Sequence, residues 1–275
     1  MDNLVAQGRK APLVFVLTSV RFQQLEALPR WIADIQDILR SRLPIFQRFH
    51  QDTLPGPQIG FAIDPPDFKP DAPGSAWLFS KSDRSLTVQI SKGVFTVHTR
   101  AYDGYAGFAE DVLFALSAFM ASAKEVHVDS AGIRYLNHLH EENGRGLSEI
   151  LPPSLLPHPA EWNEKASLVA GTSTSVYDLD EDKLRGTVWT GAEVNVIPDD
   201  LAVAYITGQN LEALVNSNEP PIAKLSQNEA TLDTDAFRLY VPTRRMQSEE
   251  IMVEIERLHR HANEFYRATT LIDAP

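Results

Sequence analysis

Between Ala76 and Arg100 the chain carries three short runs rich in apolar and β-branched residues, joined by two tight reversals. The reversals contain Asp83-Arg84 and Lys92-Gly93, which suit tight turns between strands. Strands joined by so few residues pair antiparallel, because a parallel pair needs a crossover of a dozen or more residues. This stretch therefore predicts an antiparallel meander with strands at 76–80, 85–90 and 94–100, and it argues against a parallel, doubly wound sheet.

Three other segments have the apolar spacing of amphipathic helices. They are predicted at Pro29–Leu43, at Tyr105–Ala123 and in a closing helix that begins with Ser248 as its N-cap. The helices are segregated from the meander instead of alternating with single strands. The pattern therefore predicts an α+β fold of mainly antiparallel sheets with helices packed on one face.

The rest of the chain divides this fold into two parts. Of two proline-rich stretches, 54–74 is predicted as a loop or an irregular extended segment with few donors for a central sheet, and 141–164 is predicted as a linker. The linker separates an N-terminal α+β half, 11–143, from a C-terminal α+β half, 160–271. We expect two pseudo-repeated halves that pack closely as one structural unit. Further strands are predicted at 12–22, 125–140, 166–177, 187–196, 201–207 and 236–241.

The charge of the chain restricts its partners. It carries 37 Asp and Glu against 25 Lys and Arg, a formal charge of −12. A broad nucleic-acid surface is not expected, because binding to phosphates depends on Lys and Arg. An acidic surface instead favours a protein partner of complementary potential. No membrane span and no leader segment are predicted, so we expect a cytoplasmic protein.

Metal and cofactor chemistry has little support in the sequence. The chain has no cysteine, which excludes disulfides, thiolate metal ligands and cysteine nucleophiles. His138 and His140 share one face of a predicted strand with Glu142, so they are candidate ligands for Zn²⁺ or Fe²⁺. The acidic run Asp178–Asp182 lacks the spacing of a calcium loop and is interpreted as a solvated hairpin tip. No cofactor is expected.

Motifs for nucleophilic catalysis and phosphate binding are missing from the sequence. It contains no Gly-x-Ser-x-Gly elbow, no Gly-x-x-x-x-Gly-Lys loop and no Gly-x-Gly-x-x-Gly turn. One pair of residues could still bind an anion without such a motif: Arg244-Arg245, which precedes the closing helix. Two adjacent arginines can grip a phosphate or a carboxylate, or they can pair with acidic side chains of the same chain.

Three segments resemble one sporadically distributed, uncharacterised prokaryotic protein family. The first strand ends in Val20-Arg21-Phe22, a middle strand reads Gly132-Ile-Arg-Tyr-Leu-Asn137, and the closing helix carries Leu258-His259, Phe265 and Thr270. The chain departs from the family at Gly107-Phe108, where members often have a tryptophan. The patchy distribution of this family is similar to that of genes in defence islands and toxin–antitoxin cassettes.

The shared residues suggest candidate contacts. Arg21 and Arg134 each lie near the C-terminal end of an apolar strand, and Arg134 neighbours Tyr135 and Asn137. An arginine in such a strand either satisfies buried carboxylates or faces a ligand. The candidate binding residues are Arg21, Arg134, Tyr135, Asn137, Arg244 and Arg245.

Three functional hypotheses follow. The leading hypothesis is a non-catalytic protein-binding component, antitoxin-like or associated with anti-phage defence. The second is a metal-dependent or nucleotide-processing enzyme built on His138, His140 and the strand arginines. The third is a small-ligand or nucleic-acid sensor that uses Arg134, Arg244 and Arg245. A homodimer formed by edge-to-edge pairing of strands fits any of them.

Overall fold

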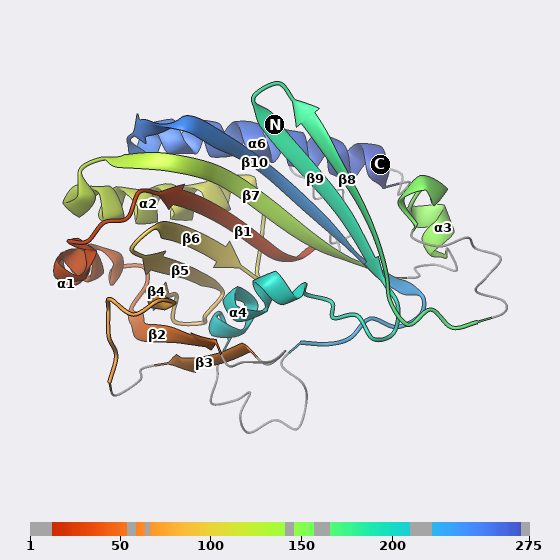
Figure 1. Ribbon diagram of the computed structural model, residues 1–275, viewed down its shortest axis with the longest axis horizontal. Helices are drawn as coiled ribbons and strands as arrows, with labels where there is room; N and C mark the ends of the chain where they lie inside the picture. Colours follow the sequence, from red (N-terminus) through yellow and green to blue (C-terminus); the bar gives the residue numbers. More distant parts are fainter. Residues whose placement is uncertain are drawn as a thin grey trace.

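The computed structural model describes residues 13–53, 59–63, 67–140, 146–156, 166–209 and 222–270, with backbone only at 51–53 and 59–63. The described strands form one antiparallel sheet in the order β3-β2-β4-β5-β6-β1-β7-β10-β9-β8 (Figure 1). The predicted α+β class is confirmed. The strands are β1 (Leu13–Phe22), β2 (Ile45–Thr53), β3 (Ile59–Ile63), β4 (Ser75–Ser80), β5 (Leu86–Ser91), β6 (Val94–Thr99), β7 (Val126–His140), β8 (Gly171–Leu179), β9 (Asp182–Thr190) and β10 (Glu229–Met246).

The predicted meander is confirmed, because β4, β5 and β6 pair in succession. The prediction is wrong in the proline-rich stretch, where β3 occupies five residues of the expected loop. It also missed β2, which connects this stretch to β4. Both errors have the same cause. Prolines lie close to both strands in the sequence, so the local pattern predicts a loop. The two strands lie at one end of the sheet, where prolines are tolerated.

In the C-terminal half, the predicted strand at 201–207 is wrong. Asp199–Thr207 forms the helix α4. The apolar run Leu201–Ile206 is too short for its periodicity to separate a strand from a helix. The decisive signal precedes it, since Pro198 followed by Asp199 and Asp200 is a typical helix start. The strands predicted at 166–177 and 187–196 are present with other bounds, as β8 and β9.

The long helices agree with the sequence. Helix α2 has the predicted bounds, Tyr105–Ala123, and α6 spans Ser248–Thr269. The predicted N-cap Ser248 is wrong by one residue: Gln247 is the N-cap, and Glu250 completes its capping box. Helix α1, Leu28–Leu39, ends before the predicted Leu43 because Pro44 disfavours a helical residue before it. Two short helical segments, α3 (Leu147–Ile150) and η1 (Pro153–Leu155), lie within the predicted linker. The remainder of that linker lies outside the described residues.

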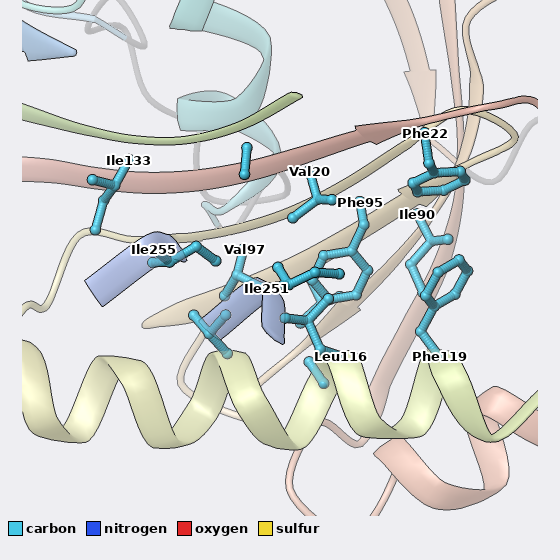
Figure 2. Close-up of a cluster of buried hydrophobic side chains, with 14 of the residues drawn as sticks. Val20, Phe22, Ile90, Phe95, Val97, Leu116, Phe119, Ile133, Ile251 and Ile255 are labelled. Carbon is cyan, nitrogen blue, oxygen red and sulfur yellow. The ribbon is translucent and has the colours of Figure 1, made fainter. Parts of the chain in front are cut away.

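The main core lies between the sheet and these helices. Helix α1 packs on α2, and α6 packs on α2, β7 and β10. Figure 2 shows Leu116 and Phe119 of α2 directed toward Phe95 and Val97 of the sheet. Phe119 also meets Phe22, with ring centroids 5.3 Å apart. Each such side chain contributes about 1.5–3 kcal/mol when it is fully buried.

The opposite face of the sheet is covered over its middle by α4. Leu201 and Tyr205 of α4 join Phe15 of β1 and Leu136 of β7 in a second cluster. Figure 1 shows α4 on the side of the sheet away from α2 and α6. This arrangement corrects the expectation that the helices pack on one face only. It also shows why β1 is apolar along nearly its whole length, since both of its faces are covered.

Helix α2 is long and apolar enough to cross a membrane by length and composition. In the structure it is a core helix instead. Phe108, Val112, Leu116 and Phe119 are buried within the main core. The strands of both predicted halves belong to the same sheet, since β1 pairs with β7 and β7 pairs with β10. The pseudo-repeat of the two halves stays a prediction.

Candidate partner-binding groove at the β10 bulge

Strand β10 changes register against β7 near its C-terminal end. Leu239 lies opposite Ser130, but the next paired residue, Arg244, lies opposite Val128. Residues 240–243 are therefore looped out of the ladder as a large bulge, which contains a cis peptide bond before Pro242. A proline fits here because it has no N–H to contribute to the ladder.

The bulge forms one wall of an open groove of about 540 Å³, lined by Glu181 and residues 238–245. We call this the β10 groove. It brings together Arg244 and Arg245, both predicted as binding residues, with Arg238, which the sequence analysis missed. The side chains of Arg244 and Arg245 are 50% and 67% exposed. Both arginines also pair within the chain, which is the alternative that the sequence left open: Nη1 of Arg244 lies 3.7 Å from Oε1 of Glu254, and Arg245 pairs with Glu125. A carboxylate of a partner would therefore add to these pairs or replace them.

Apolar side chains accompany these arginines. Val241 is 92% exposed and Leu239 is 59% exposed. Isolated exposed aliphatic residues are common on protein surfaces. Here two of them flank a groove that also offers charge-assisted hydrogen-bond donors. Such a combination is typical of protein interfaces, where apolar residues and arginine are enriched near the centre.

A buried ion network supports the groove from below. Arg257 of α6 binds Asp182 through two hydrogen bonds of 2.7 and 2.9 Å, and it also contacts Glu254. Arg238 bridges the buried Glu254 at 3.3 Å and also contacts the exposed Glu181. Because Asp182 and Glu254 are buried, these pairs hold the β8–β9 hairpin, β10 and α6 in fixed positions.

The acidic run Asp178–Asp182 was interpreted as a solvated hairpin tip. Asp178 and Glu181 are exposed at the tip, and Asp180 has the positive φ of 60° expected in such a turn. Asp182 departs from that interpretation, because it is buried in the network below the groove.

Tyr240 adds an unpartnered group at the base of the groove. Its side chain is buried, and its hydroxyl has no hydrogen-bond partner. Burial, and then the charge of Glu254, raise the pKa of Tyr240. The hydroxyl is therefore protonated over the physiological pH range and can donate. Because the hydroxyl is enclosed by protein and interacts with Glu254, it belongs to the buried network below the groove.

The predicted residue Arg134 has a structural role. Its Nε and Nη2 donate to Asp233 at 2.8 and 2.6 Å, and its Nη1 donates to Asp200 of α4 at 2.5 Å. Burial lowers the pKa of Arg134, but the bonds to the two carboxylates outweigh it and raise the pKa overall. The pair with Asp233 is buried on both sides and joins β7 to β10, whereas the pair with Asp200 joins α4 to the sheet.

Tyr135 points to the other face, as alternation along a strand requires. Its hydroxyl lies 2.7 Å from Nδ1 of His259, and the His259 ring stacks on Tyr105 with centroids 3.9 Å apart. Burial lowers the pKa of His259 to about 4, so its ring is neutral where it shares a hydrogen bond with the Tyr135 hydroxyl. This contact joins the middle strand and the closing helix, two segments on which the family resemblance rests. Asn137 is buried on the same strand.

The remaining candidates lie apart. Arg21 is exposed on β1, four residues from Leu17, which is the neighbour of Arg134. Arg244 pairs with Val128, six residues along β7 from Arg134, roughly 20 Å away. The predicted arginines therefore do not share a single site, and only Arg244 and Arg245 lie together.

The two histidines predicted as metal ligands are neighbours on β7, with ring centroids 5.9 Å apart. Nε2 of His138 lies 3.3 Å from Oε2 of Glu229. Within the described part of the chain, no group of three or more His, Asp or Glu side chains could hold a metal ion. Glu142, the third ligand of the hypothesis, lies outside the described residues. The metal site stays a prediction.

Comparison with known proteins does not extend this description. No family model matches the chain, and no curated protein matches its sequence. The resemblance to the sporadically distributed family therefore remains a prediction from three short segments.

Proposed function

We propose that this chain is a non-catalytic protein-binding component and that it engages its partner through the β10 groove. The observation that carries the proposal is the meeting of Arg244 and Arg245 with the exposed Val241 and Leu239 around one groove. The groove is open, whereas small-molecule sites enclose most of their ligand. An extended segment of a protein fits it better than a metabolite does.

The chemistry of the groove defines the segment. Val241 and Leu239 favour an apolar side chain, and the two exposed arginines favour a carboxylate beside it. The segment that satisfies both features has an apolar residue next to Asp or Glu, or it ends in a free carboxylate after an apolar residue.

The cellular role is proposed from the family resemblance. The family resemblance associates the chain with defence systems and toxin–antitoxin cassettes, so the partner is proposed to be a protein of such a system. The cytoplasm is proposed as its location. Enzyme and nucleic-acid sensor stay as alternative hypotheses. The sensor hypothesis is weakened, because Arg134 is bound to Asp233 and Asp200 and lies far from Arg244.

Selection of displayed random peptides on the immobilised protein tests the proposal. We expect enrichment of peptides that carry an apolar residue beside Asp or Glu. The double variant R244Q/R245Q should lose at least about tenfold in affinity for a selected peptide, which corresponds to about 1.4 kcal/mol. Glutamine keeps much of the side-chain length while it removes the charge.

A matched control is available on α1. Arg40 is an exposed arginine that forms a 3.5 Å pair with Asp37, and it lies in a different element from the groove. R40Q should bind the selected peptides like the wild type, and thermal unfolding should confirm that all variants fold. Equal affinity of R244Q/R245Q and R40Q, or selection of peptides without carboxylates, would contradict the proposal.

A further inference from the structure

The two edges of the sheet differ in how they are protected. At one edge, β3 has five residues, and Pro57 and Pro65 stand close to it in the sequence on either side. At the other edge, β8 has nine residues, Gly171–Leu179, with no proline, lysine or arginine. Short strands, prolines and lysines are the usual means of preventing an edge from pairing with another chain. Strand β8 has none of these.

The β8–β9 hairpin determines which backbone groups of this edge are unpaired. A two-residue turn closes on Leu179 and Asp182, and the ladder continues to Gly171 and Thr190. The closing pair of such a hairpin is hydrogen-bonded, and hydrogen-bonded pairs alternate along the ladder. The residues whose N–H and C=O point away from β9 are therefore Thr172, Thr174, Val176 and Asp178.

These outward groups have no strand beside them in the described part of the chain, where the sheet order ends at β8. The edge also exposes apolar surface. Val176 is 63% exposed, and Tyr177 is exposed as well. A nine-residue strand with four outward residues that offer backbone donors and acceptors, and with exposed apolar side chains, is a template for strand addition.

We propose that β8 pairs with β8 of a second copy of this chain across a two-fold axis. An antiparallel register centred on Ser175 places Thr174 opposite Val176 of the other copy and Thr172 opposite Asp178. All four outward residues of each copy are then paired, and each pair exchanges two hydrogen bonds. A register shifted by two residues in either direction leaves some of these groups unpaired.

The side chains agree with this register. Asp178 is the one charged residue of β8, and it lies opposite the Thr172 hydroxyl instead of another carboxylate. Like charges directly opposite would be destabilising, whereas Thr and Ser pairs are favourable. Tyr177 lies opposite Ser173, which leaves room for its ring. The sequence of β8 is thus complementary to itself, which selects a second copy over an unrelated strand.

Engineered cysteines test the register directly, because the chain has no cysteine of its own. Ser175 faces its own equivalent in a non-hydrogen-bonded pair, with Cβ atoms about 5 Å apart. S175C should therefore form a disulfide-linked dimer on oxidation, read by non-reducing electrophoresis. Two copies of residue 173 lie about 13 Å apart along the strands, so S173C should form no disulfide cross-link and should run as a single chain on the gel. The double variant S173C/Y177C should cross-link again.

Sedimentation of the unmodified full chain supplies the second measurement. We expect a dimer that becomes a monomer in T174P, which removes an outward N–H and keeps the backbone hydrogen bonds to β9. The variant also loses the 3.2 Å hydroxyl contact between Thr174 and Thr187 of β9. The thermal unfolding of T174P should show that the monomer is folded. Equal cross-linking of S173C and S175C would overturn the proposal. So would a wild-type chain that is monomeric at high concentration, or a dimer that persists in T174P.

Discussion

His98 gives the clearest prediction of how the stability of this protein depends on pH. Its side chain is buried on β6 against the Phe15 ring, and its Nε2 has no hydrogen-bond partner. Gly208, at the end of α4, packs against the other side of the ring. Burial, and then the charge of Arg100, lower the pKa of His98 to about 3 from 6.5. The imidazole is therefore neutral in the folded protein at pH 7.

The sign of the effect follows from proton linkage. Between pH 6.5 and 3 the unfolded chain binds a proton at His98 and the folded protein does not, so the stability falls as the pH falls. For pKa values of 6.5 and about 3, lowering the pH from 7.5 to 4.5 removes about 3 kcal/mol from the free energy of unfolding. The contribution is complete above pH 6.5.

The substitution H98L removes the titrating group and keeps a similar volume. At pH 7.5 we expect H98L to lie within about 1 kcal/mol of the wild type, because it deletes an unpartnered buried nitrogen. At pH 4.5 it should be the more stable protein by about 3 kcal/mol. Urea unfolding at the two pH values measures both differences, and H127Q, at an exposed histidine of β7, is the control. A loss of stability on acidification that is equal in H98L and the wild type would refute the reasoning.

Two further predictions concern stability. R134M leaves the buried Asp233 without its partner and should lower the free energy of unfolding by about 3–5 kcal/mol, whereas R134M/D233L should recover most of it, as urea unfolding can measure. G191A should lower the free energy of unfolding by roughly 1–3 kcal/mol, since Gly191 has a φ of +109° and a Cβ there would lie 2.6 Å from the Val169 carbonyl oxygen. The control G107A, on α2, adds a Cβ that meets nothing within 4 Å, so it should be neutral or stabilising. Thermal unfolding of the two variants measures the difference.

Much of the fold could be predicted from local patterns. Helix α2 was found at its true bounds because its apolar stripe of Phe108, Val112, Leu116 and Phe119 extends over about three turns. The run Leu201–Ile206 is too short to carry such a signal, so its helix was predicted as a strand. Strands β2 and β3 were missed because prolines stand on either side of each in the sequence, so the local pattern there favours a loop.

Part of the candidate site could be predicted from the sequence. The pair Arg244-Arg245 was visible as two adjacent charges, but Arg238 and Tyr240 belong to the groove only because β10 shifts register against β7. One signal was available, since Pro242 within a strand indicates an edge or a bulge. The sequence could not predict that Arg134 binds carboxylates on one face of the sheet while Tyr135 contacts a histidine on the other. The partners, Asp233 and His259, lie about a hundred residues further along the chain.

Hydrogen–deuterium exchange with and without a selected peptide tests the central claim, that partners bind at the β10 groove. We expect protection of backbone amides within residues 238–245, with the looped-out residues 240–243 most affected, since their amides lie outside the ladder with β7. The same measurement on R244Q/R245Q should show no protection. Protection elsewhere, with residues 238–245 unchanged, would contradict the account.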